Sequence, residues 1–294
     1  MHKLLKIQQF LANIVNTLVS ILRVILRSKF NSALNNMKEV QDEILVLGNG
    51  PSLRESLDKY PKFVENKKKI CVNLFVLSPE FELLRPDYYV VVDIGFFIGN
   101  TIPRVKEATI KMIKAFKDKT NWDITLLLPL EAKGSKFHKE LSSSGSYFKF
   151  IFFNRTNIMG LKSIRHFLYN KNLGMPPPQN VLIAAIMLAL NMRYKNIFII
   201  GADHSWHESL VLKEGNKMEI EDSHFYDRNE NRKLTIQDAE SQKEYKLHEL
   251  FAIWARAFGS YWYIKDYADS IKAKIFNASE KTYIDAFDRI VPKK

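Results

Sequence analysis

The chain of 294 residues has only one cysteine, Cys71, so it cannot form an internal disulfide or a zinc site built from four cysteines. Glycine and proline are also scarce, with 11 and 10 copies, whereas 46% of the residues are hydrophobic. These proportions exclude a disordered, collagenous or low-complexity chain and predict a globular protein with a large core. The lack of disulfides favours a reducing compartment, and the length fits one large domain or two small ones.

Acidic residues are absent from the first 38 positions, which hold six lysine and arginine side chains. They are Lys3, Lys6, Arg23, Arg27, Lys29 and Lys38. Half of the formal net charge of +12 therefore lies on this segment. The rest of the positive charge is diffuse and no nucleic-acid-binding motif accompanies it, so we expect no nucleic-acid partner. An anionic lipid surface or an anionic substrate fits the distribution better.

Apolar side chains recur at helical spacing from Leu4 to Leu26, with polar side chains on the opposite face, and this pattern predicts an amphipathic helix. Repeated polar interruptions argue against a membrane-spanning helix, and no signal-peptide cleavage site is visible. We expect residues 3–29 to lie in the plane of an anionic membrane, on the inner face of the cytoplasmic membrane. In the alternative, the helix packs on the body of the protein or pairs with a second subunit of a homo-oligomer.

A short apolar run, Glu43–Leu47, is followed by the block Gly48-Asn49-Gly50-Pro51-Ser52-Leu53 and then by a helical pattern. A strand that ends in a glycine-rich turn and opens a helix is typical of the phosphate-binding corner of a Rossmann-like unit. Gly48 and Gly50 would let the backbone approach a ligand, and Ser52 would cap free N–H groups of the helix. The block is neither GxGxxG nor a Walker loop, so alone it fits a plain strand-to-helix turn equally well.

Strand-like runs recur further along the chain, with helical stretches between most of them. They are Lys69–Phe75, Tyr88–Val92, Ile124–Leu128, Phe148–Phe153 and Asn196–Ile200. This alternation predicts an α/β, Rossmann-like fold with a mostly parallel sheet and helices on both faces. Ligands of such sheets bind at the carboxyl ends of the strands, and four polar residues follow apolar runs there. They are Asn49 after Ile44–Leu47, Asn73 after Ile70–Val72, Asp93 after Tyr88–Val92 and Asp203 after Ile197–Ile200. An unpaired buried amide or carboxylate costs about 1–3 kcal/mol, so we expect these four to face a ligand.

These blocks, together with the run from Ala189 to Asp203, resemble the bacterial sialyltransferases of the Campylobacter lipooligosaccharide type. They also resemble the proteins around the motility-associated Maf glycosyltransferases and the archaeal hydroxymethylpterin diphosphokinases, over about residues 43 to 226. The resemblance implies that Asn49 and Asn73 bind the nucleotide of CMP-sialic acid and that Asp203 lies near the cytidine. At the third-strand position, where this chain has Asp93, the family has an asparagine. Its Thr-Ser-Gly block aligns with residues 179–181, so the donor phosphate would be bound by Asn180 and the start of the following helix.

The resemblance also implies a histidine base in a segment beyond Asp203, for which His224 is the nearest counterpart. An inverting transfer needs a base that reaches the acceptor hydroxyl, and a histidine with a near-neutral pKa suits this role. His204 is the other candidate base, or else a hydrogen-bonded residue that holds its loop. Tyr226 would hydrogen-bond the leaving phosphate. The resembled sialyltransferases need no metal for chemistry, so we expect neither a metal nor a cofactor.

We therefore expect a helix and linker over residues 1–41 and a catalytic domain over 42–294, with a lid at about 205–245. The expected activity is a glycosyltransferase that uses a CMP-sugar, such as CMP-sialic acid or a related keto-sugar acid, to modify a cell-surface glycan or its lipid-linked precursor. The alternative is a Mg-dependent pterin-type diphosphokinase that uses ATP and gathers Asp93, Asp203 and Asp222 around the phosphates. A non-catalytic membrane scaffold is disfavoured by the polar strand ends. The aromatic run Phe258–Tyr263 either lines the acceptor site or packs between helices.

Overall fold

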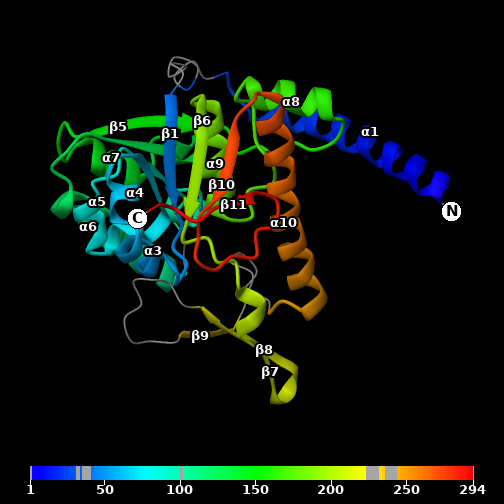
Figure 1. Ribbon diagram of the computed structural model, residues 1–294. Helices are drawn as coiled ribbons and strands as arrows, with labels where there is room; N and C mark the ends of the chain where they lie inside the picture. The colour runs from blue at the N-terminus through cyan, green and yellow to red at the C-terminus, as the bar shows by residue number, and fades with distance from the viewer. Residues whose placement is uncertain are drawn as a thin grey trace.

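The central feature of the protein is a parallel sheet with the strand order β11-β10-β6-β1-β2-β3-β4-β5 (Figure 1). The computed structural model describes residues 2–30, 34, 41–99, 102–222, 232–235 and 244–293. Every described pairing in this sheet is parallel, which confirms the predicted α/β, Rossmann-like fold. The strands are β1 (Gln41–Leu47), β2 (Lys68–Val72), β3 (Tyr88–Val90), β4 (Ile124–Pro129), β5 (Phe148–Phe153), β6 (Tyr194–Ile200), β10 (Lys274–Asn277) and β11 (Asp288–Arg289).

Helices cover both faces of the sheet, because the strands are apolar on both sides. In β1, Ile44 and Val46 enter one core cluster, whereas Leu45 and Leu47 enter the other. This alternation explains why the strands read as continuous apolar runs in the sequence. The first cluster packs against α8 (Lys162–Asn170), α9 (Val181–Asn191) and α10 (Leu247–Ser270). The second packs against α3 (Leu53–Lys59), α4 (Pro61–Glu65), α5 (Glu80–Leu84), α6 (Pro103–Lys119) and α7 (Lys136–Ser142).

The strand order reverses at β1. From β1 the chain proceeds through β2, β3, β4 and β5 on one side, and it then returns to β6 on the other side of β1. The register pairs Leu47 with Ile200, so the carboxyl ends of β1 and β6 lie next to each other. Ligands of open parallel sheets bind at such a reversal, because the loops that follow the two strands separate there. The topology therefore brings the polar ends of β1 and β6 together at the kind of position where the sequence predicted a ligand site.

Two predicted elements differ from the structure. The strand expected over Lys69–Phe75 ends at Val72, because Asn73 adopts a left-handed φ of 46° and opens a 3₁₀ turn. The predicted lid contains a small antiparallel sheet that the sequence did not indicate, which lies below the central strands in Figure 1. Its strands are β7 (Leu210–Lys213), β8 (Lys217–Asp222) and β9 (Arg232–Thr235).

The predicted amino-terminal helix is present as α1 (His2–Arg27), and it is docked through its polar face. The Thr17 hydroxyl accepts a hydrogen bond from the Leu161 N–H at 2.8 Å, and the Ser20 hydroxyl accepts one from the Met159 N–H at 2.9 Å. A Cβ on Gly160 would lie 2.2 Å from the Thr17 hydroxyl, so only glycine admits the helix this closely. The helix thus packs on the body, but with the side opposite to its apolar stripe.

The apolar stripe of α1 is exposed. It consists of Leu5, Ile7, Phe10, Leu11, Val15, Leu18, Val19, Leu22, Ile25 and Leu26. In Figure 1 the amino-terminal half of α1 projects beyond the rest of the molecule. Among the described residues, Leu5–Arg27 is the one helix whose length and mean hydropathy of 1.6 would suffice to cross a membrane. Within the predicted linker, Leu34 is buried in the core and β1 already begins at Gln41.

Candidate functional site

The glycine-rich block after β1 is held against the end of β6. The N–H groups of Gly48 and Gly50 donate to the carbonyls of Ile200 and Gly201, both at 2.8 Å. A Cβ on Gly48 would lie 2.3 Å from the Gly201 carbonyl oxygen, and one on Gly50 would lie 2.0 Å from a carboxylate oxygen of Asp203. The sequence predicted that these glycines let a ligand approach the backbone. In the structure it is the loop after β6 that approaches them closely, although Gly50 also lines the pocket described below.

Ser52 binds Asp203 instead of capping α3. Its hydroxyl donates to Asp203 Oδ2 at 2.9 Å and its N–H donates to Oδ1 at 3.2 Å. No cap hydrogen bond from the Ser52 side chain is formed, so the predicted capping role is wrong: its hydroxyl is used by the carboxylate. Burial raises the pKa of the Asp203 carboxyl, and the hydrogen bonds from Ser52 oppose this shift. Both carboxylate oxygens therefore have partners within the protein.

Most of the predicted binding residues meet in one pocket of about 240 Å³ at the carboxyl ends of β1, β2 and β6. Positions as distant in the chain as Asn49 and Asn180 contribute to its wall. The lining residues are Asn49, Gly50, Pro51, Val72, Asn73, Asn180, Val181, Leu182, Gly201, Asp203, His204, Ser205, Trp206 and Ser209. This set, which we call the switch-point pocket, includes Asn49, Asn73, Asn180, Asp203 and His204 from the sequence prediction.

Two amide oxygens in this pocket are buried and have no hydrogen-bond partner among the described residues: Asn49 Oδ1 and Asn73 Oδ1. The Asn49 amide is oriented by its Nδ2, which donates to the Val72 carbonyl at 3.2 Å. The backbone of Asn73 is fixed by Tyr89, whose hydroxyl donates to the Asn73 carbonyl at 2.7 Å. An unmet buried acceptor costs about 1–3 kcal/mol, so these oxygens are suited to hydroxyl or amine donors of a ligand.

Asn180 is held in place by an internal network. Its Oδ1 caps α9 by accepting from the N–H groups of Leu182 and Ile183, at 3.0 and 3.3 Å. The Tyr261 hydroxyl donates to the same oxygen at 3.0 Å, and Asn180 Nδ2 lies 3.3 Å from His204 Nε2. The network presents Asn180 at the positive end of α9, where a negative ligand group is favoured.

His204 is buried within this network. Its Nε2 lies 2.7 Å from the Tyr261 hydroxyl, and burial lowers the pKa of the imidazole to about 3. A group with this pKa is neutral at physiological pH and retains an abstracted proton poorly. Of the two roles considered for His204, the structure favours the loop-holding role over the catalytic one. In the aromatic segment of α10, Tyr261 is buried and joins this network, whereas Trp262 is exposed. The sequence pattern did not identify Tyr261 as a partner of His204.

An aromatic wall borders the pocket on the side of α10. The Trp206 ring lies 4.3 Å from the His204 ring and is stacked on Trp254 at 6.3 Å, with 24° between their planes. Phe258 lies 6.2 Å from Trp206. The sequence reasoning did not select Trp206, although the signal was present, since it stands three residues after Asp203 on the loop that follows β6.

Five predicted site residues lie outside the switch-point pocket or outside the described chain. Gly48 and Ser52 are absent from its lining, since they contact the end of β6 instead. Asp93 is exposed, and its carboxylate accepts from the Gly95 N–H at 2.8 Å, where it caps a 3₁₀ turn after β3. It is absent from the pocket lining because the turn directs it to solvent. His224 and Tyr226 lie outside the described residues, so their roles stay predictions. Within the described part of the chain, no group of three or more His, Cys, Asp and Glu side chains is placed to hold a metal ion.

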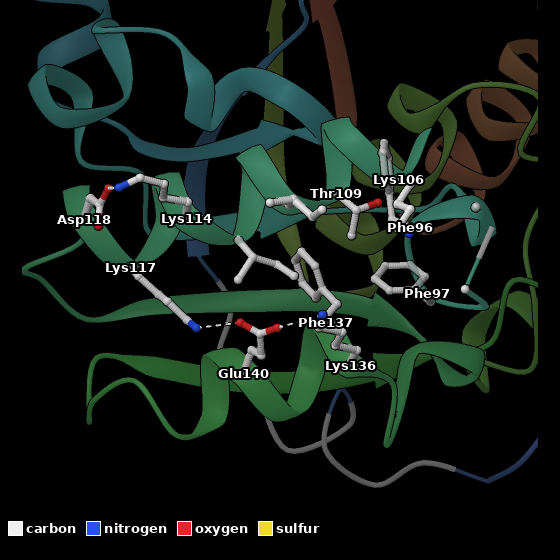
Figure 2. Close-up of a pocket in the computed structure, with 14 residues that line it drawn as sticks. Phe96, Phe97, Lys106, Thr109, Lys114, Lys117, Asp118, Lys136, Phe137 and Glu140 are labelled. Atoms are coloured by element: carbon white, nitrogen blue, oxygen red, sulfur yellow. Dashed lines mark hydrogen bonds and ion pairs between the residues drawn. The ribbon is translucent and has the colours of Figure 1, made fainter. Parts of the chain in front are cut away.

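A larger cavity, of about 790 Å³, lies elsewhere, between α6, α7 and the turn after β3 (Figure 2). Phe96, Phe97 and Phe137 form its apolar part, and lysines stand at its edge. Glu140 pairs with Lys117 at 2.6 Å and lies 3.7 Å from Lys136. This cavity contains none of the predicted site residues. The sequence feature that could have indicated it is the amphipathic, lysine-rich pattern of α6, but this pattern fits a solvent-exposed helix face equally well.

No family model matches this chain, and no curated protein matches it either. Among solved structures, it is similar to the structure of a MAf glycosyltransferase from Magnetospirillum magneticum AMB-1, with a TM-score of 0.51 and 11% sequence identity. The two share a fold. The similarity covers 90% of this chain and 35% of the other, so this chain spans about a third of that protein. It agrees with the Maf part of the sequence resemblance at the level of fold, and the sialyltransferase part stays a prediction.

Proposed function

We propose that this protein is a glycosyltransferase that binds a nucleotide-activated sugar in the switch-point pocket. The observation that carries the proposal is a pair of buried oxygens at adjacent strand ends, Asn49 Oδ1 and Asn73 Oδ1, for which the described part of the chain supplies no hydrogen-bond partner. Ribose hydroxyls and the amino group of a base are donors that would satisfy them. The shared fold with a Maf glycosyltransferase supports a transferase of this kind.

The proposed donor is a CMP-sugar, such as CMP-sialic acid or a related keto-sugar acid. The choice of CMP rests on the sequence resemblance at Asn49 and Asn73. In this arrangement the nucleoside lies against the two asparagines, and the donor phosphate lies toward Asn180 and the start of α9. The eleven-residue α9 favours negative charge at this end, which helps the nucleotide to leave. The transfer is proposed to be inverting and to need no metal.

We assign the general base to His224 and contact with the leaving phosphate to Tyr226, on the strength of the resemblance. The low pKa of His204 leaves it as a positioning residue that holds Asn180. His224→Ala should lower kcat by about 10²–10⁴-fold with little change in donor affinity. His204→Ala should weaken donor binding instead. If the two variants exchange these phenotypes, the assignment of the base is wrong.

The proposed acceptor is a cell-surface glycan or its lipid-linked precursor at the inner face of the cytoplasmic membrane. The exposed apolar stripe of α1 supports this location, because the polar face is already used for docking on the body. The absence of acidic residues before Glu39 favours an anionic lipid surface over a second copy of this basic chain. The helix would lie in the membrane plane with the body attached beneath it.

The deciding experiment measures binding of CMP, UDP, GDP and ATP to the full chain by calorimetry and thermal shift, with and without Mg²⁺. CMP should bind, and Asn49→Ala and Asn73→Ala should each weaken it at least about tenfold. Both variants should still unfold cooperatively, at a somewhat lower melting temperature, because Asn49 donates to the Val72 carbonyl and Asn73 has a left-handed φ. Asn66→Ala is the matched control, since Asn66 is exposed and absent from the pocket lining. Unchanged CMP affinity in both pocket variants would refute the site.

The diphosphokinase alternative needs clustered carboxylates around the phosphates of ATP. Asp93 is directed to solvent, and both oxygens of Asp203 are bonded by Ser52, so neither supports such a cluster. The ATP and Mg²⁺ arm of the same experiment tests this reaction class. Binding of ATP only in the presence of Mg²⁺, with no binding of CMP, would favour the alternative.

A further inference from the structure

A second polar pocket, of about 310 Å³, lies where the last turns of α1 meet the loops that follow β4 and β5. Arg23 and Arg27 of α1 line it from one side. Arg155 and Thr156, which follow β5, line it from the body, and Gln179 closes it toward α9. This arginine pocket shares no lining residue with the switch-point pocket described above.

The charge of the arginine pocket is positive. Glu131 is the one acid in its lining, and it is engaged by Arg155, whose Nε donates to Glu131 Oε1 at 3.2 Å. Arg23 and Arg27 form no ion pair with any other described residue. Two guanidinium groups thus remain for an anion. Their planar sets of donors match phosphate oxygens, which they bind through paired, charge-assisted hydrogen bonds.

The pocket is preorganised, because the end of α1 is fixed to the body. Ser28 Oγ lies 2.6 Å from the Leu173 carbonyl oxygen and 2.8 Å from the Thr156 hydroxyl. The Asn154 amide binds the backbone of Lys29 twice, accepting from its N–H at 2.9 Å and donating to its carbonyl at 2.7 Å. The two α1 arginines are therefore carried on a backbone that is already in place, which lowers the entropic cost of binding.

Two neighbouring features indicate what the anion belongs to. Pro178 and Gln179 line the arginine pocket, and Asn180 and Val181 line the switch-point pocket, so one short segment separates the two. On the other side, Ile25 is 72% exposed on the same turns of α1 as the arginines. A phosphate carried at a membrane surface would thus be bound between the apolar stripe and the proposed donor.

We propose that the arginine pocket binds the phosphate group of the acceptor, and that this acceptor is a lipid-linked, phosphate-bearing glycan. The assignment to the acceptor rests on the proposed glycosyltransferase function, whereas phosphate binding by Arg23 and Arg27 does not. The lipid part of the acceptor lies along α1, and its glycan extends past Gln179 toward the switch-point pocket.

The first test measures binding of inorganic pyrophosphate to the full chain by calorimetry. Arg23→Gln/Arg27→Gln should weaken binding at least about tenfold. The control is Lys6→Gln/Lys29→Gln, which removes the same charge from the same arm at side chains outside the pocket lining. An equal loss in both double variants would show diffuse attraction to the basic arm, and no loss in either would show that pyrophosphate binds elsewhere. Each of these results would overturn the proposal.

The second test identifies the carrier of the phosphate. The full chain is floated with phosphatidylcholine vesicles that contain phosphatidic acid, in the presence and absence of pyrophosphate. If pyrophosphate weakens the flotation of the wild-type chain, and this effect of pyrophosphate is lost in Arg23→Gln/Arg27→Gln, the result would support a lipid-borne phosphate. Flotation that pyrophosphate does not affect, with pyrophosphate binding intact, would assign the pocket to a soluble phosphate compound and overturn the lipid-linked assignment.

A third measurement separates this inference from the proposed function. Asn49→Ala should lose CMP affinity and retain full pyrophosphate affinity, because the two pockets have separate linings. If the wild-type chain binds no nucleotide but its pyrophosphate binding still depends on Arg23 and Arg27, the donor assignment fails and the phosphate site stands. Loss of pyrophosphate binding in Asn49→Ala would instead place the anion in the switch-point pocket and overturn the inference.

Discussion

The Ser52 hydroxyl donates to the Asp203 carboxylate at 2.9 Å and thereby joins the loop after β1 to the loop after β6. The two residues lie at the reversal of the strand order, where Asp203 lines the switch-point pocket and Ser52 lies outside its lining. Asp203 is 5% exposed, so the charge of its carboxylate depends on the donors that the protein supplies. This contact sets the spacing of the two loops, and hence the shape of the pocket.

Ser52→Ala should therefore lower the free energy of unfolding by about 1–3 kcal/mol, because it leaves a buried carboxylate oxygen without its hydroxyl donor. Urea denaturation of the free protein measures the effect. Ser52→Thr keeps the hydroxyl and should retain most of the stability. Equal stability of the alanine variant and the wild type would mean that the contact does not hold the loops.

Gly50→Ala should destabilise the fold, whereas Gly259→Ala should not. The added methyl at Gly50 would lie 2.0 Å from Asp203 Oδ2 and 2.7 Å from the Gly201 carbonyl, where backbone must move. At Gly259, within α10, no atom lies within 4 Å of the added methyl, and alanine gains about 0.5–1 kcal/mol in a helix interior. The two melting temperatures should move in opposite directions. A decrease of similar size in both would contradict the tight packing inferred at Gly50.

The parallel sheet and the pocket residues Asn49 and Asn73 were predictable, because burial on both faces leaves an unbroken apolar run and a polar residue marks its end. Asn180 precedes α9 and was indicated only by the family resemblance. The small sheet of β7, β8 and β9 was not predictable, since Leu212 and its neighbours in β7 are exposed and show little alternation of apolar and polar side chains. Helical periodicity revealed the two faces of α1 but not which one contacts the body. That choice depends on Thr17, Ser20 and Gly160, which are brought together only by the tertiary fold.

The His204 imidazole should make stability depend on pH. Its pKa of about 3 in the folded protein lies below its ordinary value of 6.5. Between these values the unfolded chain binds a proton that the folded protein does not, so the free energy of unfolding falls as the pH is lowered, by about 1.4 kcal/mol per pH unit. His204→Gln should show a shallower fall over the same window in urea titrations. Parallel pH profiles would show that the imidazole is protonated in the folded state.

Substitutions on the two faces of α1 should change different properties: membrane binding for the apolar stripe and thermal stability for the polar face. Leu18 and Leu22 are 63% and 56% exposed, so Leu18→Ser/Leu22→Ser should weaken flotation with anionic vesicles and leave the melting temperature nearly unchanged. Ser20 is buried against the body, where its hydroxyl accepts from the Met159 N–H. Ser20→Ala should therefore lower the melting temperature, because it leaves that buried N–H without its acceptor. If the leucine variant loses thermal stability and still floats, the stripe is covered by protein, and gel filtration of the wild-type chain should then reveal a dimer.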